Sequence, residues 1–146
     1  MASFTTWNII MLDLENVNVL ETGDYKGYKY LIASHPAGFR LGYVALPKSH
    51  PWHGLTWFDT IDVHGGLSYV GAGTSGEWWI GFSCDEPGDA PDNTLNILSD
   101  NAHKPGVVRT QEWVRNELHI LIDQVQSASK VKRKPRKSKV VIEELK

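Results

Sequence analysis

Acidic, imidazole, indole and glycine residues are concentrated between residues 59 and 85 of this 146-residue chain. Asp62 lies two positions before His64, and Gly65 and Gly66 follow at once. On a strand, residues two apart share a face, so the Asp62 carboxylate would lie beside the His64 imidazole. Such a pair can fix a histidine tautomer, raise the histidine pKa or bind a metal ion. The two glycines allow positive φ angles or the close approach of a ligand, and a β-bulge would explain them equally well.

Two further histidines, His50 and His53, precede this segment in a proline-bracketed loop that could fold back over it. Three histidines and one or two aspartates suffice for Zn²⁺ or Mn²⁺. However, the spacing matches no named metal signature, since there is neither a His-Glu-x-x-His motif nor a cysteine pair. Exposed loop histidines, with one ring bonded to the backbone, are the alternative. We therefore expect no cofactor, and keep as an alternative a divalent metal held by His50, His53, Asp62 and His64.

Aromatic rings and carboxylates follow the glycine pair. Trp78 and Trp79 are adjacent, so a strand would send them to opposite faces, with one in the core and Trp79 free to stack on a planar ligand. Asp85, Asp89 and Asp92 lie on the next loop. They could cap backbone amides, bind a cation or accept hydrogen bonds from ribose or a base, and solvated loop acids are the alternative.

Two motifs in this region carry little weight. Residues 71–76 match G-x-G-x-x-G, but a strand-like run follows where a dinucleotide site needs a helix, so a hairpin loop is predicted. Cys84 has no local nucleophile signature, and the chain has no Gly-x-Ser-x-Gly elbow. The sequence therefore favours binding over nucleophilic catalysis.

The composition, with 41% hydrophobic and 22% charged residues, is that of a single globular domain. A single cysteine excludes an intramolecular disulfide and suits a reducing compartment. The N-terminal residues lack a signal-peptide pattern, and no apolar run is long enough to cross a bilayer. We expect a cytoplasmic protein with no membrane partner.

Charge is distributed unevenly along the chain. The formal net charge is −2, yet residues 130–139 contain seven Lys or Arg and no acid, which leaves an acidic body. We expect a globular domain over residues 1–128 and a flexible basic tail over residues 129–146. This tail could contact nucleic acid non-specifically, but it has no aromatic residue to stack on bases.

Hydrophobic periodicity predicts an α+β fold. One long helix is expected over residues 110–127, because Val114, Leu118, Leu121, Ile122 and Val125 form one apolar face. An antiparallel sheet of about five strands would pack against this C-terminal helix. Turn chemistry is expected at residues 22–24 and 26–27, a helical turn at 55–61 and a long loop at 85–106. The predicted strands cover residues 5–12, 17–20, 28–33, 39–46, 62–70 and 77–84.

Several blocks of the chain resemble a family of small, uncharacterised proteins of bacteriophages and prophages. That family has a His-Gly-Gly-Leu-Thr-Tyr-like block, a Trp-x-x-Gly-Phe-Asp-Cys-like block and a C-terminal helix. The resemblance covers roughly residues 40–125, and departs from the family at Ser83 and at Asp85-Glu86. It implies a viral or prophage origin and a location in the host cytoplasm, without a settled activity. The matching blocks are Gly42–Val44, His50-Pro51, Asp62–Tyr69 and Trp78–Cys84.

Together these features predict a phage-type protein that binds and sequesters a small nucleotide-like ligand, such as a host defence signal. Trp79 would stack the base, the histidines would meet phosphate or ribose, and Arg40 or Arg109 would supply positive charge against the acidic body. The expected ligand contacts are Arg40, His50, His53, Asp62, His64, Gly65, Gly66, Trp79, Asp85, Asp89 and Arg109.

Two alternatives remain open at this point. One is a metal-dependent phosphodiester hydrolase, with Asp85 near a metal-bound water. The other is a protein-interaction module that inhibits a host protein, with exposed tryptophans as hot spots. Homo-oligomer formation is also left open.

Overall fold

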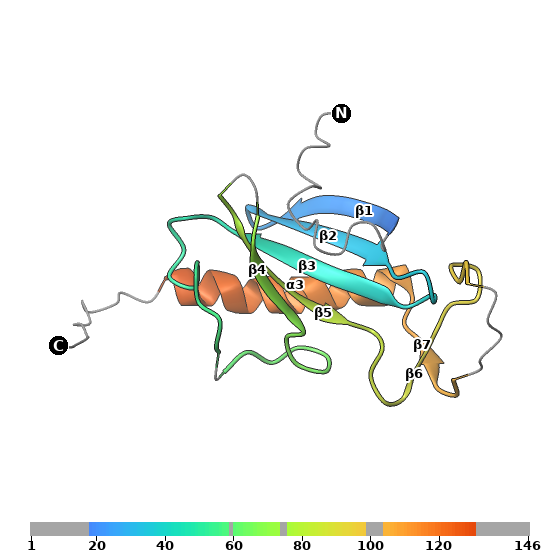
Figure 1. Cartoon of the computed structure of the whole chain (residues 1–146). Helices are drawn as coiled ribbons and strands as arrows, with labels where there is room; N and C mark the ends of the chain where they lie inside the picture. Colours follow the sequence, from blue (N-terminus) through green and yellow to red (C-terminus); the bar gives the residue numbers. More distant parts are fainter. Residues whose placement is uncertain (1–17, 59, 74–75, 99–103, 131–146) are drawn as a thin grey trace.

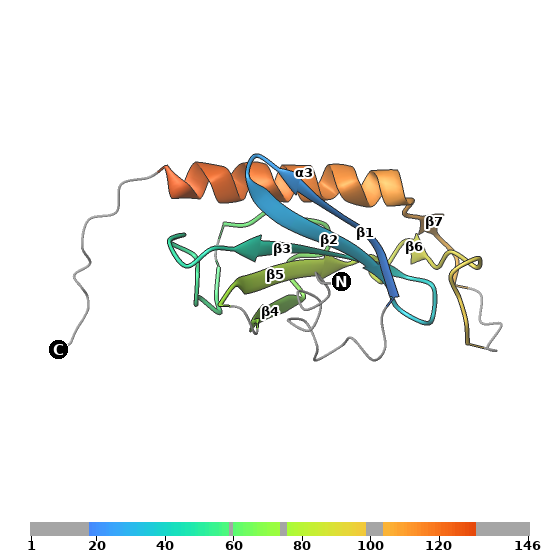
Figure 2. The ribbon, with the colours of Figure 1, turned by 90° about the horizontal axis from the view of Figure 1, so that it is seen from above.

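The computed structural model describes residues 18–58, 60–73, 76–98 and 104–130. It contains a five-stranded antiparallel sheet in the order β1-β2-β3-β5-β4. A single long helix, α3 (Gln111–Ser129), lies across one face of this sheet (Figure 1), and Figure 2 shows the same two layers from above. The predicted α+β architecture is therefore confirmed. The strands are β1 (Asn18–Tyr25), β2 (Tyr28–Ser34), β3 (Arg40–Leu46), β4 (Tyr69–Ala72) and β5 (Trp78–Ser83).

The helix forms as its pattern predicts. The Thr110 side chain caps its start by accepting a hydrogen bond from the main-chain N–H of Trp113, and Glu112 adds an acid to the first turn. The five apolar residues predicted to face the sheet are all fully buried. They pack against β2, β3 and β5 side chains that include Tyr30, Ile32 and Phe82.

The opposite face of the sheet has its own buried cluster. Side chains alternate along a strand, so the neighbours of the residues that face α3 point to this second face. The cluster combines small, aliphatic and aromatic side chains. Its buried members are Leu31, Ala33, Tyr43, Ala45 and Trp79.

A tight turn joins β1 to β2, and one predicted turn is wrong. The β1–β2 turn is Lys26-Gly27, where φ is +52° and +86°, the left-handed pair that a two-residue hairpin requires. Residues 22–24 were also expected to turn, but they lie within β1 and pair with β2. The predicted hairpin across residues 71–76 is confirmed by the antiparallel pairing of β4 with β5.

The region between β3 and β4 also differs from the prediction. Residues 62–70 were expected to form one strand, but only Tyr69 and Val70 belong to β4, and residues 62–68 form a loop. No helical turn forms in the described part of residues 55–61. The predicted strand at residues 5–12 and the tail beyond residue 130 lie outside the described residues.

The long loop after β5 contains a short parallel pair at one end of the molecule (Figure 1). β6 (Asp89–Ala90) pairs with β7 (Val107–Val108), and α3 begins three residues later. This pairing draws residues 85–92 toward the start of α3, where the polar residues of the candidate site meet. None of the helices in the described parts of the chain has the length and apolar character needed to cross a membrane.

A network around Glu21 fastens β1 to α3. Both carboxylate oxygens accept hydrogen bonds from Arg115, at 2.6 and 2.7 Å, and others come from Gln111 and Tyr30. The hydrogen bond from Arg115 is the main cause that lowers the Glu21 pKa to about 2, from 4.5. At neutral pH the carboxylate is therefore charged and fully paired.

We expect Glu21→Gln to lower the free energy of unfolding by about 1–2 kcal/mol at pH 7, because it removes the charge that Arg115 binds. Because the folded pKa is the lower one, the unfolded chain binds more protons between pH 4.5 and 2. The contribution of Glu21 is therefore complete above pH 4.5 and is lost as the pH falls toward 2. Urea unfolding of both proteins at several pH values checks this, with Asp24→Asn as an exposed control. A loss of unfolding free energy in Glu21→Gln that is as large at pH 2 as at pH 7 would contradict this assignment.

Candidate functional site

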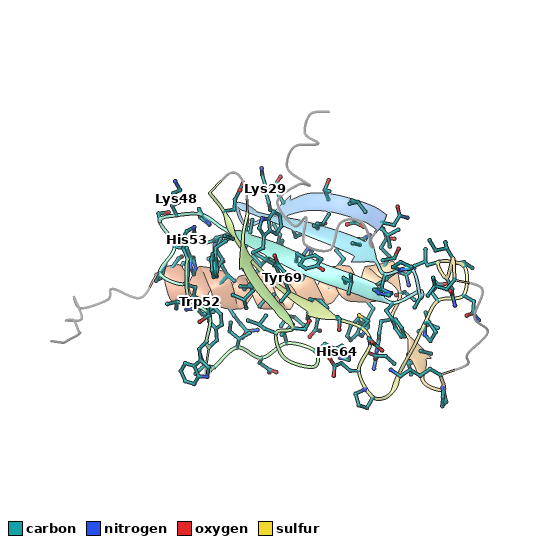
Figure 3. All side chains as sticks on the ribbon, viewed as in Figure 1. Lys29, Lys48, Trp52, His53, His64 and Tyr69 are labelled. Atoms are coloured by element: carbon teal, nitrogen blue, oxygen red, sulfur yellow. The ribbon has the colours of Figure 1, made fainter. Side chains whose placement is uncertain are left out.

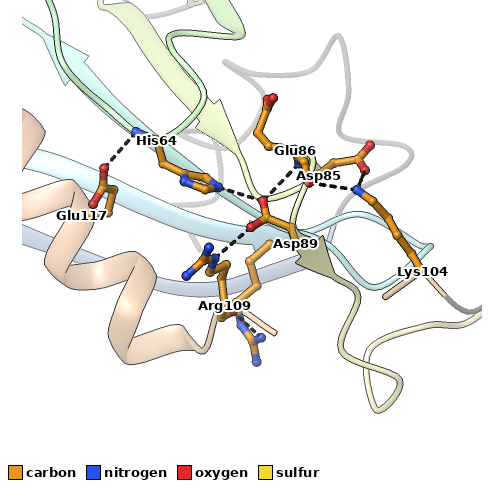
Figure 4. A network of polar contacts seen from close by, with 8 residues as sticks. His64, Asp85, Glu86, Asp89, Lys104, Arg109 and Glu117 are labelled. Atoms are coloured by element: carbon orange, nitrogen blue, oxygen red, sulfur yellow. Dashed lines mark hydrogen bonds and ion pairs between the residues drawn. The ribbon is translucent and has the colours of Figure 1, made fainter. Parts of the chain in front are cut away.

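The buried carboxylate of Asp89 is the centre of a polar network at the end of the sheet near β6 (Figure 4). The residue is 0% exposed. Its Oδ2 accepts hydrogen bonds from His64 Nε2 at 2.7 Å and from the main-chain N–H of Glu86 at 3.0 Å. Its Oδ1 accepts one from Arg109 Nε at 2.8 Å. Three segments that are distant in the sequence are thus tied to one side chain.

The contacts of Asp89 and His64 determine where the hydrogen between them lies. Burial raises the pKa of Asp89, but the hydrogen bonds from His64 and Arg109 outweigh it and leave the pKa below its usual value. Asp89 is therefore ionised at neutral pH and can only accept hydrogen bonds. It follows that His64 Nε2 carries the hydrogen, and in the neutral ring Nδ1 has a free lone pair.

His64 is held in place from three sides. Besides its bond to Asp89, its main-chain N–H donates to Glu117 Oε2 at 2.8 Å. Its ring meets the Trp113 ring edge-on, with centroids 5.0 Å apart. The His64 side chain nevertheless keeps 17% of its surface exposed. In the described part of the chain, no protein group pairs with Nδ1 of this ring.

The turn after His64 needs both of its glycines. Gly65 and Gly66 have φ angles of +69° and +79°, which other residues rarely adopt. A Cβ on Gly65 would also fall 2.5 Å from Glu86 Cγ. The missing side chain thus lets the Glu86 side chain pack against the turn that carries His64. The positive φ angles considered from the sequence are confirmed, whereas no β-bulge forms because these glycines lie in a loop; the close approach of a ligand stays a prediction.

The cationic side chains around the network are each paired with an acid. Arg40 donates Nη2 to Asp92 at 3.0 Å and Nη1 to the main-chain oxygen of Arg109 at 2.9 Å. Lys104 bonds to Asp85 at 3.2 Å. The Arg109 guanidinium, besides binding Asp89, lies 4.6 Å from the centre of the Trp113 ring.

The structure brings part of the predicted ligand set together and separates the rest. Four predicted residues lie elsewhere, and Figure 3 shows His53 and His64 well apart from each other. The residues gathered around the network are Arg40, His64, Gly65, Gly66, Asp85, Asp89 and Arg109. The residues placed elsewhere are His50, His53, Asp62 and Trp79.

His50 and His53 bond to main-chain groups. His50 is buried, with Nε2 bonded to the Val125 oxygen at 2.7 Å and Nδ1 accepting from the Trp52 N–H at 2.9 Å. Burial lowers the pKa of His50 more than its bond to Val125 raises it, so the ring stays neutral. His53 bonds through Nε2 to the Gly76 oxygen at 2.8 Å. Both histidines therefore fasten loops and, contrary to the expectation from the sequence, are not gathered with His64 around Asp89.

The expectations for Asp62 and Trp79 are corrected in the same way. Asp62 has an exposed side chain, and its main-chain N–H and oxygen pair with the side chain of Gln124. His64 instead pairs with Asp89, so the predicted Asp62–His64 pair is wrong. Trp79 is 1% exposed within the second core cluster, where no planar ligand can stack on it.

The metal alternative loses its specific ligand set, because its four members do not meet. Across the described residues, no group of three or more His, Cys, Asp or Glu side chains is placed to hold a metal ion. Both ring nitrogens of His50 are also engaged with main-chain groups.

Sequence reasoning missed four residues of the network: Glu86, Lys104, Trp113 and Glu117. Trp113 and Glu117 lie one turn apart on α3, so they share a face beside the apolar stripe. That spacing is the only local signal for them. Their partner His64 lies 53 residues before Glu117, and only the fold brings the two together.

Cys84 lies beside the network and is expected to be unreactive in the folded protein. Burial, aided by the charge of Asp89, raises the pKa of the Cys84 thiol to about 12, and the residue is buried. Iodoacetamide at pH 8 should therefore leave the folded protein unmodified and alkylate it fully in urea, as read by intact mass. A Ser68→Cys variant supplies an exposed thiol as the control. Labelling of Cys84 as fast as that control would contradict the expectation.

Comparison of the chain with models of known protein families, with curated proteins and with solved structures finds no match.

Proposed function

We propose that this protein binds a small, polar, nucleotide-like ligand at His64 and sequesters it without chemical conversion. The site consists of His64, the Gly65-Gly66 turn, Glu86 and Arg109, with Trp113 beside them. The resemblance to phage proteins suggests a host defence signal as the ligand. Of the contacts expected from the sequence, the proposed site keeps His64, Gly65, Gly66 and Arg109 and omits the others.

One observation carries this proposal: the His64 ring is held by Asp89 and Trp113, yet it is partly exposed, and no described residue pairs with its Nδ1. A polar network that served packing alone would satisfy its members internally. Here the buried Asp89 carboxylate and the Glu117 carboxylate position an imidazole ring that stays partly exposed. Such support for a partly exposed group is what a preorganised binding site requires.

The ligand itself can be sought by mass spectrometry of the purified protein, first native and then denatured, with metals measured in the same sample. We expect an intact small molecule to be released on denaturation from the wild-type protein and to be absent from His64→Gln. Glutamine can still donate a hydrogen bond to Asp89, so the network retains a partner there. His53→Gln is the matched control and should keep the ligand. Wild-type protein that releases no small molecule on denaturation would count against the proposal.

A second candidate function rests on a separate observation. The Trp57 side chain is 73% exposed, with exposed Leu55 beside it, and exposed tryptophans are frequent hot spots of protein interfaces. We propose protein interaction at this loop as the alternative. A host protein that binds the wild-type chain and His64→Gln, but not Trp57→Ala, would favour it over ligand binding.

A further inference from the structure

The positively charged side chains near His64 are each paired with an acid, although Arg40 Nε and the terminal nitrogens of Arg109 have no hydrogen-bond partner among the described residues. Arg40 uses both terminal nitrogens, on Asp92 and on the Arg109 oxygen. Lys104 binds Asp85 and the main-chain oxygen of Glu86. Arg109 uses Nε on Asp89 and lies over Trp113. The positive charges of this region are therefore already neutralised by neighbouring acids.

Hydrogen-bond acceptors, in contrast, remain free. Glu86 contributes its main-chain N–H to Asp89 and its main-chain oxygen to Lys104, while its carboxylate has no partner among the described residues. His64 Nδ1 has a free lone pair in the neutral ring, since Nε2 carries the hydrogen. Among the described residues, the Glu86 carboxylate and, when the ring is neutral, His64 Nδ1 are thus unpaired acceptors.

These two acceptors lie close to each other. The Glu86 side chain packs against the Gly65 backbone, since a Cβ there would fall 2.6 Å from Glu86 Oε2. Gly65 follows His64 directly, and both Glu86 and His64 bond to Oδ2 of Asp89 (Figure 4). A single small molecule can therefore reach the Glu86 carboxylate and the His64 ring together.

The charge around the site favours a ligand that donates hydrogen bonds. The network around Asp89 and its neighbouring ion pairs contain five acids and three bases, so the region has an excess of negative charge that disfavours phosphate. The acids are Asp85, Glu86, Asp89, Asp92 and Glu117, and the bases are Arg40, Lys104 and Arg109.

We propose that the ligand is recognised through N–H groups that it donates to Glu86 and His64, and not through its phosphates. A carboxylate can accept two parallel hydrogen bonds, and a guanine base offers two adjacent donors on one edge. A guanine-type base would place this edge on Glu86 and leave a further donor for His64 Nδ1. This inference rests on the proposed function and names the chemistry of the recognised group.

Calorimetric titration of the full chain with guanosine, and separately with inorganic pyrophosphate, tests this inference. Guanosine should bind and pyrophosphate should not. Glu86→Gln keeps the size of the side chain but replaces one acceptor oxygen with a donor, so it should weaken guanosine binding about tenfold or more. Glu112→Gln, an exposed change in the first turn of α3, is the matched control and should bind like the wild type.

Two outcomes would overturn the inference. Binding of pyrophosphate that becomes tighter in Glu86→Gln would show that the site recognises anions. Failure of guanosine to bind, or equal binding by Glu86→Gln, would show that donor recognition by Glu86 is wrong. The proposed function is judged separately, because a ligand found by mass spectrometry and lost in His64→Gln would keep it valid even then.

Discussion

Replacing Asp89 with alanine is expected to lower the free energy of unfolding by about 3–5 kcal/mol, among the largest effects of any single substitution in this protein. The carboxylate is 0% exposed and joins His64, Arg109 and the Glu86 main chain. Its removal leaves Arg109 without its acid and an N–H of Glu86 without an acceptor. Breaking a buried ion pair on one side costs more than the pair itself contributes.

Urea unfolding at pH 7 measures this effect, with Asp85→Ala as the control. Asp85 also pairs with a cation, Lys104, but its side chain is 55% exposed, so its loss should cost less than about 1 kcal/mol. Because the Asp89 pKa is lowered from 3.8, the Asp89 contribution is present above that pH and is lost as the pH falls below it. Equal losses for the two variants at pH 7 would show that Asp89 does not hold the site together.

Trp79→Ala should be the second large effect, again about 3–5 kcal/mol of unfolding free energy. Trp79 is 1% exposed and packs with Leu31, Tyr43 and Ala45 on the sheet face opposite α3. Truncating Trp79 therefore leaves a cavity in a packed cluster. Truncating a tryptophan that stacks on a ligand at the surface would leave no such cavity.

The matched control is Trp57→Ala, because Trp57 is 73% exposed and should change the unfolding free energy by less than about 0.5 kcal/mol. Thermal or urea unfolding of both variants distinguishes a core residue from a ligand-stacking residue. If Trp79→Ala kept full stability and lost the bound ligand, the stacking role expected from the sequence would be restored.

The elements with regular hydrophobic periods could be predicted from the sequence. The apolar stripe of α3 follows from its 3.6-residue repeat, and all five of its members are buried. Strands β2, β3 and β5 follow from their apolar and aromatic runs. These features are local, so the sequence contains all the information needed to find them.

The site could be predicted only in part, because its pairings are not local. His64 was expected to pair with Asp62, its neighbour two residues away, but the loop at residues 62–68 removes the shared strand face. Its actual partner, Asp89, lies 25 residues further on and is brought near by the short β6–β7 pair. Local spacing cannot encode such a contact.

The tryptophan pair shows a different limit of sequence patterns. Alternation correctly separates Trp78 from Trp79, but it does not say which faces are buried. Both faces of this sheet have buried clusters, so Trp79 is enclosed. Trp78, the first residue of β5, keeps partial exposure and donates a hydrogen bond from Nε1 to the Leu55 oxygen at 2.9 Å.

The most direct test of the central claim is the amount of ligand that co-purifies with two histidine variants, measured per molecule of folded protein by mass spectrometry. His64 is placed at the site, whereas His53 fastens a loop through the Gly76 oxygen. We predict that His64→Gln loses the ligand and that His53→Gln retains as much as the wild type. Ligand retained by His64→Gln, or lost from His53→Gln with the fold intact, would contradict a binding site at His64.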